Sequence, residues 1–166
     1  MKRTITAVAL AAAVLAVAPR QADAQASITA QAEIATALTV NPGNDLDFQL
    51  VIPGFTKTVA VNDGTAGTFS LTGGAGAEVV LTFTALPANL TGPGGDLPIS
   101  YTGVHNTTAD PVAGATVFTP SAGATTNLSG TGELYVYLGG TVDATGQSVD
   151  GIYDELVTLT AAYTGS

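Results

Sequence analysis

The feature that most constrains the fold is an alternation of apolar and polar residues with a period of two, which runs through almost every segment after residue 24. The clearest case is Ser27–Val40, where only Thr36 interrupts the apolar face. Successive side chains of a β-strand point to opposite sides, so this period indicates strands rather than helices. The apolar face of this segment consists of Ile28, Ala30, Ala32, Ile34, Leu38 and Val40. We therefore expect a long N-terminal strand followed by an all-β domain.

Turn signals divide the rest of the chain into shorter strands. The pattern predicts strands at 46–50, 56–61, 68–72, 78–85, 99–104, 134–138 and 152–163, and loops at 86–98 and 105–130. A turn is expected at Asn41–Asn44, and Gly139-Gly140 permits a bulge or bend. Short strands at roughly even spacing, with no repeat of fixed period, predict a single antiparallel β-sandwich domain.

The first 24 residues have the features of an export signal. Met1-Lys2-Arg3 is a charged start, an apolar run follows from Ile5 to Ala18, and Ala22-Asp23-Ala24 resembles a cleavage site. The apolar run is too short to span a bilayer comfortably. We expect cleavage after residue 24 and a secreted domain of residues 25–166 that does not insert into the membrane.

Cleavage makes the chain strongly acidic. It removes three of the four basic residues and one of the 13 acids, which leaves 12 acids and Lys57, a net charge of −11. Nucleic acids are bound through clusters of Lys and Arg, so nucleic acid is excluded as a partner, and an anionic membrane surface is equally unfavourable. With no cysteine, the domain has no disulfide, and its stability must come from sheet and core or from a partner chain.

The inventory of catalytic groups argues against an enzyme. The chain has one histidine, no cysteine and no Gly-x-Ser-x-Gly motif, so a nucleophile paired with a base is not evident. We expect His105 to be an exposed loop residue. One histidine without cysteine does not fill a tetrahedral zinc site, and no cofactor is expected.

Two groups of acids require a separate interpretation. Asp45 and Asp47 share one face of an extended segment, and Asp150, Asp154 and Glu155 cluster near the end of the chain. Neither group has the spacing of an EF-hand loop. Calcium binding and acid-dependent hydrolysis are alternatives to the simpler interpretation, in which carboxylates at strand ends keep the sheet soluble and block edge pairing.

The C-terminal third carries a family resemblance. Residues 130–142 (GTGELYVYLGGTV) and 150–163 (DGIYDELVTLTAAY) resemble a secreted bacterial β-sandwich family of unknown function, similar to spore-coat-U-type proteins and chaperone–usher pilin subunits. The Thr68–Gly73 strand and turn also look like that family. The chain departs from it in having no cysteine and no Gly after Leu46-Asp47-Phe48. The resemblance implies an immunoglobulin-like or pilin-like fold, a place on the bacterial cell surface, and a fibre or pilus as the assembly.

The resemblance also implies a mechanism of assembly. Pilin-like subunits lack a strand, and an N-terminal segment of the next subunit fills the gap, in some systems with a periplasmic chaperone and an outer-membrane usher. Residues 25–40 would then be the donor strand, with the apolar face defined above as its contact face. The acceptor groove would include the final strand through Val157, Leu159 and Tyr163.

Two alternatives remain open at this stage. The N-terminal segment can fold back onto its own domain, because periodicity does not distinguish insertion within one chain from insertion into another. The protein can also be a monomeric secreted module that binds a glycan or surface ligand through the loops 86–98 and 105–130.

Overall fold

The computed structural model describes residues 25–31, 34 and 36–165, so the predicted export signal and Ala32 lie outside the described residues. The chain divides into two units, Met1–Glu33 and Ile34–Ser166. In the first unit, residues 25–31 belong to no strand, and each of them is exposed. The described residues contain no helix long and apolar enough to cross a membrane.

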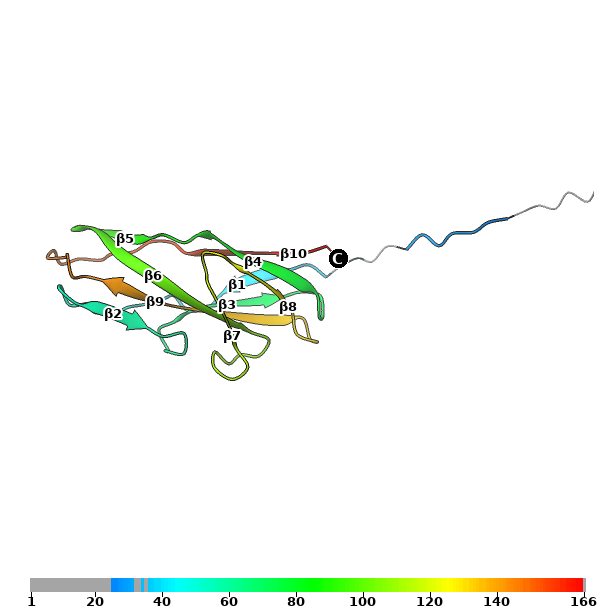
Figure 1. Ribbon diagram of the computed structural model, residues 1–166, viewed down its shortest axis with the longest axis horizontal. Coiled ribbons are helices and arrows are strands. Elements are labelled where there is room, and N and C mark those ends of the chain that lie inside the picture. The colour runs from blue at the N-terminus through cyan, green and yellow to red at the C-terminus, as the bar shows by residue number, and fades with distance from the viewer. Residues whose placement is uncertain (1–24, 32–33, 35, 166) are drawn as a thin grey trace, which may run out of the picture. The chain divides into compact units, whose positions relative to one another are not determined.

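The second unit is all-β and antiparallel, as the sequence predicts, and the ten strands form two sheets (Figure 1). The larger sheet has the order β1 (Thr39–Pro42), β3 (Gly67–Thr72), β9 (Glu133–Asp143), β6 (Gly95–Asn106) and β5 (Asn89–Gly92). In addition, β2 (Thr56–Val59) pairs with β9, and β7 (Thr116–Phe118) pairs with β6. The smaller sheet has the order β10 (Thr158–Tyr163), β4 (Glu78–Ala85) and β8 (Ala124–Asn127). This architecture is consistent with a β-sandwich.

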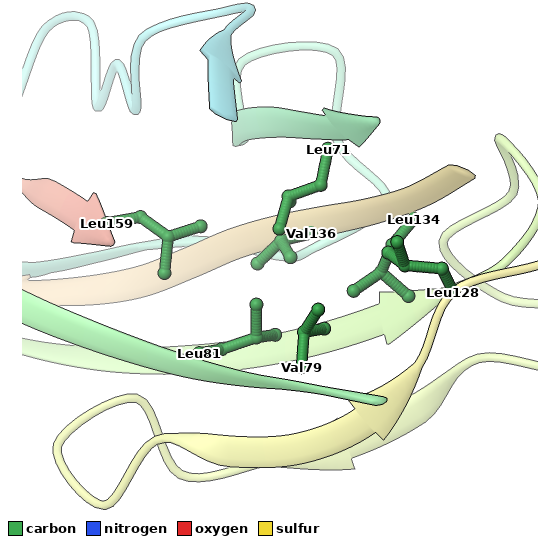
Figure 2. Close-up of a cluster of buried hydrophobic side chains, with 7 residues drawn as sticks. All are labelled: Leu71, Val79, Leu81, Leu128, Leu134, Val136 and Leu159. Atoms are coloured by element: carbon green, nitrogen blue, oxygen red, sulfur yellow. The ribbon is translucent and has the colours of Figure 1, made fainter. Parts of the chain in front are cut away.

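The smaller sheet packs on one half of the larger sheet through a common core. Alternate residues of β3 and β9 face alternate residues of β4 and β10, which is why the period of two in these segments buries one face of each strand. Figure 2 shows the cluster, which consists of Leu71, Val79, Leu81, Leu128, Leu134, Val136 and Leu159.

A second core cluster lies on the other half of the larger sheet. β9 pairs with β6 over eight residues and contributes to both clusters, with Val136 in the first and Val142 in the second. The described strands of the smaller sheet contribute nothing to this cluster, and irregular segments cover it instead. Its buried members are Phe48, Val59, Ala66, Leu97, Val142 and Ala144.

The N-terminal strand is much shorter than predicted. Of Ser27–Val40, only Thr39 and Val40 belong to a strand among the described residues, and β1 continues through Asn41 and Pro42, where a turn was expected. A strand requires a hydrogen-bonded partner, and β3 pairs with this part of the chain only at residues 39–42. Pro42 is tolerated because β1 is an edge strand, whose outer side has no ladder partner.

Two predicted loops contain strands. Residues 86–98 form most of the β5–β6 hairpin, which turns at Gly92–Gly95, and residues 105–130 contain β7 and β8. Gly139-Gly140 produces no bulge, because β9 passes through both residues with unbroken pairing to β6. The two glycines serve close packing: a Cβ at Gly139 would lie 2.6 Å from the carbonyl oxygen of Val59.

His105 is not the exposed loop residue that was expected. It lies at the end of β6, it is 8% exposed, and its ring centroid is 5.7 Å from that of Phe118 in β7. The strand signal was weak here because Thr, Gly and Asn surround the histidine. Burial lowers the pKa of His105 below its ordinary value of 6.5.

This lowered pKa predicts a loss of stability in mild acid. Below pH 6.5 the unfolded chain binds a proton at this histidine while the folded chain resists it, so the free energy of unfolding falls as the pH falls. We expect the urea midpoint to be lower at roughly pH 5 than at roughly pH 7.5, and we expect His105→Phe to reduce this difference. Equal pH dependence in the two proteins would contradict this assignment.

Candidate binding groove

A groove opens beside the second core cluster, between two irregular segments, Asn44–Pro53 and Val149–Val157. Its volume is about 910 Å³. The inner face of the larger sheet forms the floor, with side chains from β3, β6 and β9. The groove exists because the three strands of the smaller sheet cover the first cluster and no described strand continues over the second.

The first wall, Asn44–Pro53, covers the floor with two side chains and then turns outward. A Cβ at Gly140 would lie 3.4 Å from the Phe48 ring, and one at Gly67 would lie 3.2 Å from Leu46, so both wall side chains rest on glycines of the floor. The Gln49 N–H donates to the Asp47 carboxylate at 2.7 Å, and Gln49 has φ 54°. This left-handed residue ends the alternation that the sequence suggests for 46–50.

The second wall, residues 149–157, has little backbone pairing and is held mainly by Tyr153, which packs on the second core cluster. Its backbone pairs with the rest of the described chain through Asp154 alone, whose N–H and C=O exchange hydrogen bonds of 3.2 and 3.4 Å with Thr91. The Tyr153 hydroxyl donates to the Val149 carbonyl at 2.9 Å and accepts from the Gly94 N–H at 3.0 Å. The predicted strand 152–163 therefore begins only at Thr158, since residues 155–157 have no strand beside them.

β10 and β1 are edge strands of their sheets in the described chain, and they lie near each other. The segments that continue from these two strands form the two walls. Unpaired N–H and C=O groups at a sheet edge are a template for another strand.

The rim of the groove exposes large apolar side chains. Four of them are between 46% and 81% exposed, and all four line the groove: Leu50, Val149, Ile152 and Leu156. Single exposed apolar residues are normal on a protein surface, but a gathered set around a hollow is typical of an interaction site. The sequence does not predict that these four residues are exposed, because the alternating pattern predicts that apolar residues lie on the buried face of a strand.

The floor contains one unsatisfied polar group. The hydroxyl of Tyr101, on β6, is shielded from solvent and has no hydrogen-bond partner, and it is the single buried side-chain atom of this kind in the described part of the chain. Burial raises the pKa of Tyr101 to about 12, and the charge of Glu155 on the second wall adds to the effect. The phenol is therefore protonated at neutral pH and is able to donate a hydrogen bond.

The acids that the sequence singles out all border this groove. Each of the five is exposed to solvent, whereas a general acid is usually held in a buried, apolar setting. Within residues 25–31, 34 and 36–165, no three His, Cys, Asp or Glu side chains gather in a way that could hold a metal ion. The acids give the rim a negative charge; they are Asp45, Asp47, Asp150, Asp154 and Glu155.

The predicted acceptor residues lie in different surroundings. Val157 lines the groove and is half-buried. Leu159 belongs to the first core cluster and pairs with Phe83 of β4. The Tyr163 hydroxyl accepts from the Gly74 N–H and donates to the Thr36 carbonyl, both at 2.7 Å, so it lies at the far end of β10. Leu46, Phe48 and Tyr101 line the groove and were missed, because only the fold brings them together.

The predicted donor residues also divide into two sets. Ile28 and Ile34 are each 95% exposed, and Ala30 is exposed as well. Leu38 and Val40 are half-buried and pack against the first core cluster of their own domain. Ala32 lies outside the described residues.

Comparison with protein-family models, with curated proteins and with solved structures found no match. Any function assigned to the chain therefore rests on its sequence, its fold and the groove.

Proposed function

We propose that the protein is a secreted bacterial surface protein, pilin-like in architecture, whose copies assemble into a fibre. In this proposal the N-terminal segment of one copy enters the groove of the next copy as an added β-strand. The observation that carries the proposal is that one chain contains both an open groove with an apolar rim, whose walls continue from two edge strands, and an exposed alternating segment.

The groove supports the proposal through its shape and its backbone. It has a volume of about 910 Å³ and is bounded by residues 44–53 and 149–157. β-Strand addition derives affinity from main-chain hydrogen bonds and specificity from alternate side chains in pockets. The backbone groups of residues 155–157, which have no strand partner in the described chain, would provide the hydrogen bonds, and the apolar rim and floor would provide the pockets.

The donor segment supports the proposal through its exposure and its charge. Ile28 and Ile34 are the two most exposed large apolar residues of the described chain, and burying one such side chain contributes about 1.5–3 kcal/mol. Because Leu38 and Val40 are anchored in their own domain, the donor in this proposal is restricted to residues 25–34. That segment has a single acid, Glu33, so it meets little repulsion from the acidic rim.

The test is the behaviour of the secreted protein in SDS. A strand shared between copies is released only on nearly global unfolding, so the polymer dissociates slowly. We expect a ladder of bands without boiling, one band after boiling, and filaments in negative-stain electron micrographs of the same sample.

A single band under both conditions, with no filaments, would contradict the fibre. That result is what either alternative requires, whether the segment folds onto its own domain or the protein is a monomeric module that binds a glycan. Ligand screening by thermal shift would then distinguish these two, since a bound ligand raises the melting temperature of the folded state.

A further inference from the structure

The unpartnered hydroxyl of Tyr101 requires an explanation. A buried hydroxyl without a partner costs about 1–3 kcal/mol, and native structures contain few such groups. Tyr101 lines the groove floor from β6, opposite Gly140 of β9 in the register. An unsatisfied donor in the lining of a groove is a group that an occupant with a hydrogen-bond acceptor would satisfy.

The surroundings of Tyr101 show what could satisfy it. Phe48 and Leu46 lie over Gly140, the residue that pairs with Tyr101, so the nearest wall offers apolar side chains. The opposite wall has one backbone pairing with the rest of the described chain, at Asp154, and is also held by Tyr153, whose hydroxyl accepts from the Gly94 N–H. The second wall also carries Glu155, whose charge acts on Tyr101 but which makes no hydrogen bond to it. The hydroxyl is therefore free to donate to an acceptor on an occupant of the groove.

We propose that Tyr101 is the residue that recognises the inserted strand, by donating a hydrogen bond to a main-chain carbonyl of residues 25–34 of a second copy. The inference rests on the proposed function and identifies the residue that binds the inserted segment. The contact face of the donor is apolar, so its backbone carbonyls are the available acceptors. Ala30, in the middle of the segment, has a small side chain that leaves room for the phenol ring to reach the backbone.

The experiment measures binding of a synthetic peptide with the sequence of residues 25–37. The acceptor is the full secreted chain carrying Ile28→Asp and Ile34→Asp, which removes its own ability to donate. We compare this acceptor with the same chain carrying Tyr101→Phe, by fluorescence anisotropy of the labelled peptide. The matched control is Tyr137→Phe. Tyr137 lies in β9 between two buried residues, so its own side chain points away from the core.

We expect Tyr101→Phe to weaken peptide binding about 3- to 10-fold, the usual effect of one hydrogen bond, and Tyr137→Phe to leave it unchanged. The urea midpoint of the free chain should be unchanged or higher with Tyr101→Phe, because the substitution removes an unsatisfied hydroxyl. A peptide carrying Ala30→Leu should bind more weakly to the parent acceptor and show a smaller difference between parent and Tyr101→Phe.

The outcomes separate this inference from the proposed function. If the peptide binds the parent and the Tyr101→Phe acceptor equally well, the fibre proposal stands and the role of Tyr101 is wrong. If the peptide does not bind the parent at all, the proposed function fails and the inference fails with it. A lower urea midpoint for the free Tyr101→Phe chain would assign Tyr101 a structural role and also overturn the inference.

Discussion

Replacing both Ile28 and Ile34 with aspartate is expected to abolish the SDS-resistant ladder while leaving the folded domain intact. Both side chains are 95% exposed in the single chain, so charging them removes no described packing contact. In an occupied groove the same positions would bring two carboxylates into an apolar site with an acidic rim, and burying unpaired charges is strongly unfavourable. We expect no detectable polymer on unboiled gels and a circular-dichroism spectrum like that of the parent.

The matched control places the same charges on the other face of the segment. Thr29→Asp and Gln31→Asp add two carboxylates at positions that alternate with the apolar ones, so in an inserted strand they would face solvent. The ladder should persist in this variant. If both double variants lose the ladder equally, the effect is one of net charge and the assigned contact face is wrong; if both retain it, the donor lies elsewhere in the chain.

The sequence predicted the central strands well because their burial follows a simple rule. β4 has the predicted bounds of Glu78–Ala85, and β3 begins one residue before its predicted start. In both strands one side faces a packed sheet, so the period of two in the residues is the period of burial. Turn residues at Gly73–Gly76 then mark where β3 ends and β4 begins.

The prediction fails where a single local interaction overrides the pattern. Leu46, Phe48 and Leu50 alternate as a strand would, yet the Asp47 carboxylate captures the N–H of Gln49 and the backbone becomes left-handed there. Leu50 is consequently 80% exposed although Phe48 is buried. Hydrophobic periodicity carries no information on such a turn.

The groove was beyond sequence reasoning for a different reason. Its floor and walls come from segments that lie far apart in the chain, and it exists because no described strand of the smaller sheet covers the second core cluster. Residues 152–157 look like the first half of a strand that ends at Tyr163, and only the sheet pairing shows that this half has a single bridge, from Asp154 to Thr91, in place of a strand partner. The residue pattern of a segment does not show whether another strand of the fold pairs with it.

Leu134→Ala and Leu156→Ala should separate folding from assembly. Leu134 is fully buried between the two sheets, and such substitutions cost about 2–5 kcal/mol because a cavity remains. That loss is a large share of a usual stability of about 5–15 kcal/mol, so the urea midpoint should fall steeply. Leu156 is 76% exposed on the groove rim, and its truncation should change stability by less than about 0.5 kcal/mol.

Assembly should show the opposite order at a temperature where both variants are folded. Truncating Leu156 removes apolar surface that an inserted strand would cover, so the ladder should form more slowly and at higher protein concentration. Leu134→Ala leaves the rim unchanged and should polymerise like the parent once folded. If Leu156→Ala instead destabilises the free chain by several kcal/mol, the rim already belongs to the core of the single copy, and the groove is then closed in solution and unable to accept a strand.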